Sequence, residues 1–166
     1  LGTRVQTHSA PWLGLPYTDG PLGEAGGPDP DPVVRYDTFD CLTFVEEVLA
    51  LSLATDPINV QAVRMGLRYR GGAPATFENR RHFMLAEWIP GTIEEGWMED
   101  LTPRLPGAKQ ISRTVRDETW RQWSRRDLFP LEDERLPVGT QSFWFLPLDA
   151  AAAAMDRIPP GSVIFT

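Results

Sequence analysis

Cys41 is the only cysteine among the 166 residues, and the residues around it favour a reactive thiol. Asp37, Thr38 and Asp40 precede it and are residue types that begin helices, and apolar residues follow at helical spacing from 42 to 51. The first turn of a helix presents unpaired amides and the positive end of the helix dipole, which favour thiolate over thiol. Because the thiolate is the nucleophilic form, this position suits attack on a carbonyl carbon.

The stretch after Cys41 predicts an amphipathic helix. Its apolar positions are Leu42, Val45, Val48, Leu49 and Leu51. Glu46 and Glu47 are predicted to face away from this apolar stripe. Asp56-Pro57 is predicted to stop the helix near Ala54. The alternative for Cys41 is a small buried side chain without chemistry, and its position alone does not decide between the two.

The composition limits the class of protein. A chain of 166 residues is long enough for one core, and we expect a single domain over residues 1–166. A formal net charge of −7 and the lack of a basic block argue against nucleic-acid binding. The sequence contains no run of about 18 apolar residues, which is the length that a membrane-spanning helix needs. One cysteine and two distant histidines give no metal-ligand spacing, no glycine-rich phosphate loop occurs, and no cofactor is expected.

The remaining elements follow from periodicity and turn chemistry. We expect a short helix or turn within 1–15, an exposed loop at 23–32, an extended piece at 33–36, and helices at 59–69 and 81–89, the last ended by Pro90-Gly91. Further on we expect a strand-like segment at 97–102, a loop over 105–136 with one helix around 115–125, a strand at 141–146 and a helix at 150–157. A strand is predicted at 163–165, and we expect further strands of the domain beyond Thr166.

Several sequence blocks, in order, resemble a known family. They are Gly-Leu-Pro-Tyr at 14–17, Phe-Asp-Cys-Leu-Thr-Phe-Val-Glu at 39–46, Asn-Arg-Arg-His-Phe at 79–83 followed by Trp88-Ile89, Gly-Trp-Met-Glu-Asp-Leu-Thr at 96–102, and Pro-Gly-Ser-Val-Ile at 160–164. Together they resemble the bacterial N-acetylmuramoyl-L-alanine amidase-like family, exported proteins within the NlpC-type, papain-like cysteine peptidase superfamily.

The resemblance implies an α+β, papain-like NlpC-type core, in which the nucleophile helix packs on a small antiparallel barrel-like sheet. It implies hydrolysis of an amide bond in peptidoglycan stem peptides, in the periplasm or cell envelope. Cys41 would be the catalytic nucleophile and would form an acyl-thioester, with amides at the helix start as the oxyanion hole. Tyr17, Asp40 and Arg80 would bind substrate. The alternatives are an ordinary loop tyrosine at Tyr17, and a solvated helix start at Arg80 and Arg81.

The mechanism also needs a histidine as general base. In relatives it begins the strand after the Gly-Ser-Val-Ile strand, so the resemblance implies a main catalytic histidine beyond Thr166. His82 matches a different block, which we interpret as part of the substrate groove, and it is the alternative base within these residues. His8 has no motif support.

Two other functions remain open from the sequence. One is a catalytically incomplete module that binds peptidoglycan peptides, and the other is an acyltransferase on the same scaffold. The sequence does not indicate which amide bond is cut, and it gives no oligomeric state.

Overall fold

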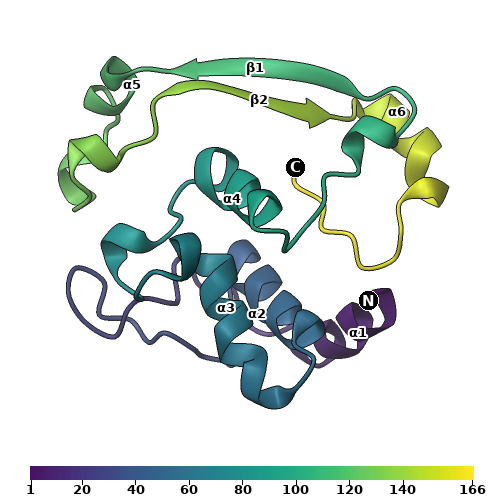
Figure 1. Ribbon diagram of the computed structural model, residues 1–166, viewed down its shortest axis with the longest axis horizontal. Coiled ribbons are helices and arrows are strands. Elements are labelled where there is room, and N and C mark those ends of the chain that lie inside the picture. The colour runs from purple at the N-terminus through teal and green to yellow at the C-terminus, as the bar shows by residue number, and fades with distance from the viewer. The chain divides into compact units, whose positions relative to one another are not determined.

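The computed structural model describes residues 1–166, and contacts within the chain divide it into two units. The first unit comprises Leu1–Arg80 with Pro159–Thr166, and the second comprises Arg81–Ile158. Six α-helices and one antiparallel two-stranded sheet, which is not closed, make this an α+β protein, as predicted (Figure 1). No helix is long and apolar enough to cross a bilayer. The single domain over 1–166 stays a prediction.

The first unit is built on helices α1 (Gly2–Ser9), α2 (Cys41–Leu53) and α3 (Val60–Arg68). Helix α2 packs against both α1 and α3, and its core residues Val48, Leu49 and Ala50 are buried (Figure 1). These helices confirm the predictions for 1–15, for the cysteine helix and for 59–69. Helix α2 is therefore held on two sides.

Contacts at the far end of α2 fix its length. Arg4 of α1 donates from Nη2 to the carbonyl oxygens of Leu51 at 2.9 Å and Ala54 at 2.5 Å, which satisfies carbonyls left open where the helix ends. The backbone of Ala54 is already extended, and Pro57 follows Asp56 in a 3₁₀ turn, Pro57–Asn59. The predicted end near Ala54 is confirmed.

Glu46 and Glu47 do not face solvent, so the prediction that they face away from the core is wrong. Both are buried, and both lie against arginines of α3: Arg68 Nε donates to Glu46 Oε2 at 2.7 Å, and Arg64 Nε donates to Glu47 Oε1 at 2.6 Å. The two arginines are four residues apart and so share one face of α3. The sequence pattern of α2 alone cannot reveal this burial, because the partners of both glutamates lie on another helix.

The second unit holds α4 (Ile89–Glu94), β1 (Lys109–Val115), α5 (Asp117–Arg121), β2 (Gly139–Phe145) and α6 (Leu148–Ala154). Strands β1 and β2 pair along their whole length, with Lys109 opposite Phe145 and Val115 opposite Gly139. Hydroxyl pairs across the ladder add hydrogen bonds, among them Ser112 to Ser142 at 2.8 Å. Strand β2 and helix α6, with the 3₁₀ turn after it, confirm two predicted elements.

The helix predicted at 81–89 begins later and does not end at Pro90-Gly91. A π turn at Met84–Trp88 leads into α4, which runs through both residues to Glu94. In the π turn the Trp88 N–H bonds the Phe83 carbonyl at 3.0 Å, and proline is tolerated in the first turn of the helix that follows. Gly91 leaves room for the Arg81 side chain, since a Cβ at this position would lie 2.5 Å from the Arg81 Nε.

The strand-like segment predicted at 97–102 is absent. Gly96 has a φ of +78° and ends α4 in a Schellman motif, in which the N–H of Trp97 bonds the Thr92 carbonyl at 2.9 Å. The backbone of Trp97 thus belongs to the helix cap. A 3₁₀ turn, Thr102–Arg104, follows, with the Thr102 N–H on Asp100 Oδ1 at 2.9 Å.

Strand β1 lies inside the region 105–136, where the sequence predicted only a loop and one helix around 115–125. The helix exists but is shorter, as α5. Ile111, Thr114 and Val115 were the missed signal, since three β-branched residues in seven favour a strand. The exposed charges Lys109 and Arg113 obscured it.

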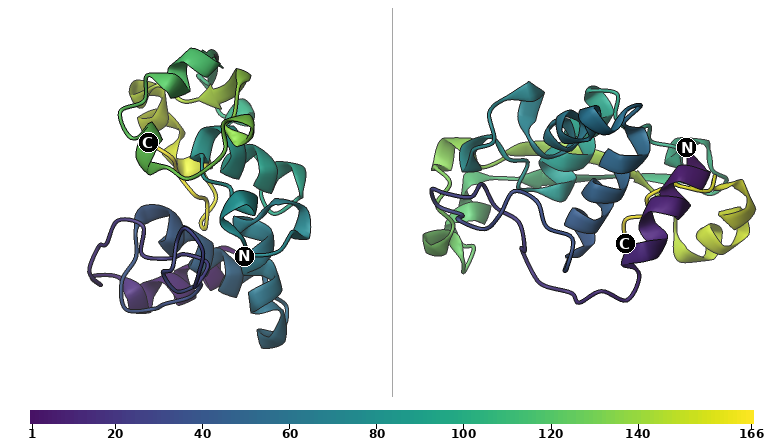
Figure 2. Two further views of the ribbon diagram at one scale, coloured as in Figure 1. Left: turned by 90° about the vertical axis from the view of Figure 1, so that its left-hand side faces the viewer. Right: turned by 90° about the horizontal axis from the view of Figure 1, so that it is seen from below.

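The predicted strand at 163–165 has no ladder partner and is not a strand in the structure. Instead, Ser162 closes a turn on the Pro159 carbonyl, and Gly161 packs against Gly2 of α1, which brings this segment beside the first helix (Figure 2). β-propensity without a pairing partner does not make a sheet.

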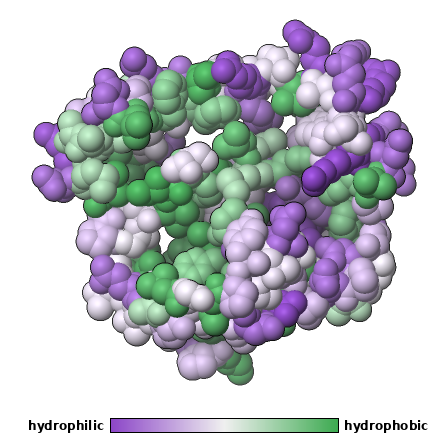
Figure 3. All heavy atoms as spheres, turned by 180° about the vertical axis from the view of Figure 1, so that it is seen from behind, coloured by the Kyte–Doolittle hydropathy of each residue, from purple (hydrophilic) through white to green (hydrophobic).

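Apolar side chains also reach the surface, as the hydrophobic areas in Figure 3 show.

Candidate functional site

Cys41 is the first residue of α2, and a capping box fixes this start. The Thr43 N–H donates to Asp40 Oδ1 at 2.7 Å, and the Asp40 N–H donates to Thr43 Oγ1 at 3.0 Å. The thiol of Cys41 is free and exposed, so Cys41 is not the buried side chain of the alternative, while its reactivity stays a prediction. Its neighbouring amides are those of the first helical turn, which have no carbonyl partner within the helix.

The loop that carries Tyr17 is bound to the segment immediately before Cys41. The Phe39 N–H bonds the Pro16 carbonyl at 3.2 Å, and the Thr18 N–H bonds the Phe39 carbonyl at 3.1 Å. Tyr17 and Phe39 therefore form an isolated parallel bridge. The Thr38 hydroxyl adds bonds to the Pro16 carbonyl at 2.8 Å and to Thr18 Oγ1 at 2.7 Å.

This arrangement brings Tyr17 into the electrostatic environment of the thiol. The pKa of the Tyr17 phenol is raised, first by desolvation and then by the negative charges of Cys41, Asp40 and Asp19. Because the pKa of the phenol is raised above its ordinary value, the hydroxyl is protonated at neutral pH. Tyr17 is also 68% exposed, so a ligand can reach it. A protonated phenol can donate a hydrogen bond to a carbonyl oxygen or an oxyanion.

Asp40 has both carboxylate oxygens in use. Oδ1 accepts from the amide and hydroxyl of Thr43, and Oδ2 accepts from the Gly20 N–H at 3.3 Å. Asp40 thus links the Tyr17 loop to the helix start. Its predicted contact with substrate stays a prediction, and these contacts give it a structural role at the same position.

An aromatic cluster includes residues on both sides of Cys41 in the sequence. Trp12 stacks on Tyr36 with ring centroids 5.6 Å apart, and it packs on Phe39 at 5.1 Å and Phe44 at 6.4 Å. Phe39 and Phe44 also contact each other edge-on at 5.7 Å. Phe39 and Phe44 flank Cys41 in the sequence, so this cluster anchors the backbone on both sides of the thiol.

Arg80 lies in the same unit but is engaged by two acids. Its Nη2 is 2.6 Å from Glu24 Oε1 and 3.0 Å from Asp29 Oδ2, and its guanidinium lies over the Phe77 ring. A substrate carboxylate would have to compete with both acids. The contacts support a role in fixing the loop at 23–32, while substrate binding stays a prediction for Arg80.

The solvated helix start proposed for Arg80 and Arg81 is also wrong. Arg81, in the second unit, is buried and forms an ion pair with Glu95. Arg80 is partly buried against Glu24 and Asp29. Neither arginine begins a regular α-helix.

His82 belongs to the second unit, where its ring meets Phe129 edge-on with centroids 5.1 Å apart. Its backbone N–H donates to Glu87 Oε2 at 2.8 Å. Phe83, Trp120 and Trp123 extend this group of rings. An aromatic environment suits the predicted groove residue, and the identity of the base stays a prediction.

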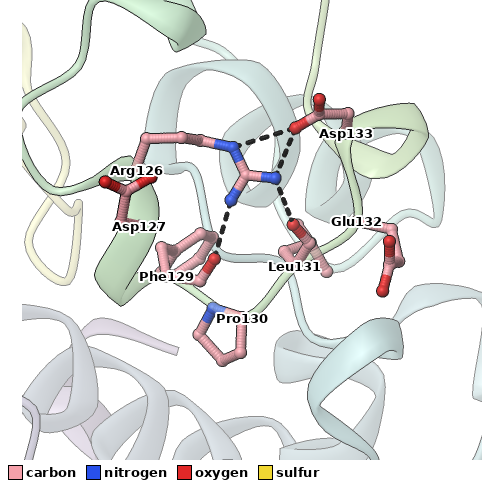
Figure 4. Close-up of a pocket in the computed structure, with 7 residues that line it drawn as sticks. All are labelled: Arg126, Asp127, Phe129, Pro130, Leu131, Glu132 and Asp133. Carbon is pink, nitrogen blue, oxygen red and sulfur yellow. Dashed lines mark hydrogen bonds and ion pairs between the residues drawn. The ribbon is translucent and has the colours of Figure 1, made fainter.

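A hollow of about 380 Å³ near Arg126 is a weaker candidate. Figure 4 shows the Arg126 guanidinium turned toward its own loop, where it donates to the carbonyls of Phe129 and Leu131 at 2.8 Å each and pairs with Asp133. These contacts use the cation to fasten the loop. The residues that could do covalent chemistry lie instead at the start of α2.

The comparisons with known proteins agree with the order of the sequence blocks. A family model for N-acetylmuramoyl-L-alanine amidase-like proteins matches residues 7–165. The chain belongs to this family. The predicted amidase-like family is thereby confirmed. In a separate comparison, no curated protein matches the chain.

Three solved structures resemble the amidase-like chain in fold. A Legionella pneumophila protein is 24% identical, with a TM-score of 0.80, over 96% of this chain and 64% of that one. An N-acetylmuramoyl-L-alanine amidase from Bacteroides uniformis is 24% identical, with a TM-score of 0.67, over 88% and 64%. A Bacteroides fragilis protein provisionally named a xylanase is 22% identical, with a TM-score of 0.65, over 87% and 66%. The chain thus spans about two thirds of the length of these proteins or slightly less.

Two arginines of α3 that the sequence did not single out also contact the surroundings of the site. Arg64 and Arg68 bind glutamates of α2, and they donate to Tyr36 and Val33 in the segment before Cys41. A signal was present, because two arginines four residues apart on α3 match two adjacent glutamates on α2 in charge. Of the predicted site residues, the structure brings Cys41, Tyr17 and Asp40 together.

Proposed function

We propose that this protein is a cysteine-dependent amide hydrolase that acts on peptidoglycan stem peptides through an acyl-thioester, on an NlpC-type, papain-like scaffold. The observation that carries the proposal is the position of Cys41, an exposed thiol on the first residue of a capped helix with Tyr17 beside it. Membership of the amidase-like family supports amide hydrolysis as the reaction and peptidoglycan as the substrate class.

The reaction has two halves. In the first, the Cys41 sulfur attacks the scissile carbonyl carbon, and a base carries the thiol proton to the leaving nitrogen as the C–N bond breaks. In the second, water attacks the thioester, the C–S bond breaks and the sulfur recovers its proton. Each half passes through an oxyanion, for which the amides of the first turn and the Tyr17 hydroxyl are the proposed donors.

The base is a histidine in this proposal. The resemblance to the family favours a histidine beyond Thr166, and His82 is the alternative within the 166 residues. Because the substrate is a cell-wall polymer, we expect the protein to act in the periplasm or cell envelope.

Digestion of purified peptidoglycan tests the proposal. The wild type should release fragments with new amine and carboxylate ends, identified by mass spectrometry, and Cys41→Ala should release none. Cys41→Ser, which keeps the size of the side chain but weakens the nucleophile, should be nearly as inactive. If wild type and Cys41→Ala give the same fragments, the hydrolase proposal fails. Co-sedimentation of an inactive wild type with peptidoglycan would favour the binding module.

A further inference from the structure

Two buried arginines on α3 contact the segment that leads to Cys41. Arg64 donates from Nη2 to the Tyr36 hydroxyl at 3.0 Å, while its Nε and Nη2 also bind the two carboxylate oxygens of Glu47 at 2.6 and 2.7 Å. Arg68 donates from Nη1 to the Val33 carbonyl at 2.8 Å. Each arginine therefore joins α3, α2 and the segment 33–36.

Stability alone is a poor reason for this cluster. Burying four charges costs desolvation energy that their attraction does no more than offset, and apolar side chains of similar volume often serve as well. An apolar core, however, would not specify where segment 33–36 lies along the helices. The planar guanidinium, with donors in fixed directions, does specify it.

The contacts continue from this segment to the thiol. Tyr36, bonded to Arg64 through its hydroxyl, stacks on Trp12, and Trp12 packs on Phe39 and Phe44 on either side of Cys41. Phe39 in turn carries the bridge to the Tyr17 loop. A displacement of Tyr36 would be passed through packed rings to the residues that flank the nucleophile.

We propose that Arg64 is a positioning residue for Cys41, acting through its hydrogen bond to Tyr36, with Arg68 holding Val33 of the same segment. The inference rests on the proposed function for its catalytic consequence. Its structural content concerns the thiol alone and can be measured without a substrate.

Two conservative variants break the bridge and keep the charges balanced. Tyr36→Phe removes the hydroxyl but keeps the ring on Trp12, and the Arg64 Nη2 remains bonded to Glu47. Arg64→Lys keeps a cation beside Glu47 but lacks the planar fork that reaches both partners. In each variant, iodoacetamide at pH 7 should alkylate Cys41 about three- to tenfold more slowly than in wild type. This is the range of rates that the loss of one hydrogen bond gives.

Because both changes break one bridge, the double variant should be no slower than Arg64→Lys alone. In peptidoglycan digestion, kcat should fall by the same factor and KM should change by less than about twofold. Arg4→Met is the matched control, since it removes two hydrogen bonds from the other end of α2. It should lower the thermal midpoint but leave the alkylation rate at the wild-type value.

Three outcomes would overturn the positioning role: alkylation at the wild-type rate in Tyr36→Phe and Arg64→Lys, an equal loss in Arg4→Met, or additive losses in the double variant. Failure of the hydrolase proposal would give a different result. None of these proteins would then cut peptidoglycan, while the alkylation rates would still report whether the bridge positions Cys41.

Discussion

Arg64 of α3 binds Glu47 of α2 through two parallel hydrogen bonds, from Nε to Oε1 at 2.6 Å and from Nη2 to Oε2 at 2.7 Å. The exposed fractions of the two side chains are 4% and 0%. A bidentate, fully desolvated pair of this kind fixes the rotation of both helices about their axes. It therefore determines which face of α2 meets α3, and with it the direction in which Cys41 emerges.

Removing one member of this ion pair should lower the free energy of unfolding far more than removing both members. Glu47→Ala leaves a buried, unpaired guanidinium and should lower the free energy of unfolding by about 3–5 kcal/mol. The double variant Glu47→Leu/Arg64→Met removes both charges and should cost about 2 kcal/mol or less. Urea denaturation of both variants measures the difference, and a double variant as unstable as the single one would contradict it.

Two variants of Asp40 should distinguish its role as a helix cap from a role of its charge in substrate binding. Asp40→Ala loses the bond to the Thr43 amide and should lower the free energy of unfolding by about 1 kcal/mol, whereas Asp40→Asn keeps a capping oxygen and should be nearly neutral. Thermal denaturation measures this cost. If the Asp40 charge also contacts substrate, Asp40→Asn should raise KM at unchanged stability. An unchanged KM would confine Asp40 to the cap.

Tyr69 should make the protein less stable above pH 10. Burial, followed by the charge of Glu24 and the hydrogen bond to it, raises the pKa of Tyr69 from 10.0 to about 12. Between these values the unfolded chain loses the proton and the folded chain keeps it, so the stability present below pH 10 declines as the pH rises toward 12.

The decline should amount to about 2 kcal/mol by pH 11.5 and somewhat under about 3 kcal/mol when complete, because each unit of pKa shift represents about 1.4 kcal/mol. Urea denaturation between pH 9 and pH 11.5 measures it, within the range where the protein still refolds. Tyr69→Phe is the control and should flatten this part of the profile. An equal slope in both proteins would assign the decline to other groups.

Gly91 should tolerate no side chain. In Gly91→Ala the new Cβ would lie 2.5 Å from the Arg81 Nε, so Arg81 would have to move away from Glu95. We expect a loss of about 1–3 kcal/mol in the free energy of unfolding, typical of overpacking at a close contact. Gly26→Ala, where no heavy atom lies within 4 Å of the added Cβ, is the control and should be within about 0.5 kcal/mol of wild type.

His82→Ala should distinguish a groove residue from a base. As a groove residue packed on Phe129, its loss should raise KM several-fold and change kcat by less than about threefold. Loss of a general base would instead lower kcat by about a hundredfold or more. Steady-state kinetics on muropeptides measures both constants. A fall of that size in kcat would make His82 the base.

Local sequence determined the elements that depend on neighbouring residues. Asp40 and Thr43 specify the start of α2 through bonds that span three residues, so Cys41 could be assigned to the first turn without a structure. The family could also be inferred from ordered blocks, because their spacing is written in the chain. The strand β2 could be predicted from its run of aromatic residues, Phe143, Trp144 and Phe145.

Tertiary structure decided what depends on partners distant in the chain. The solvent side of α2 could not be inferred, because Glu46 and Glu47 pair with arginines 22 and 17 residues away, respectively, and a buried charge looks like a surface charge in sequence. The segment 163–165 has β-propensity, yet it forms no strand without a neighbour to pair with. Sequence thus set the position of Cys41 at the start of α2, and tertiary packing set which face of α2 meets α3, because ion pairing and strand pairing depend on contacts that no local pattern encodes.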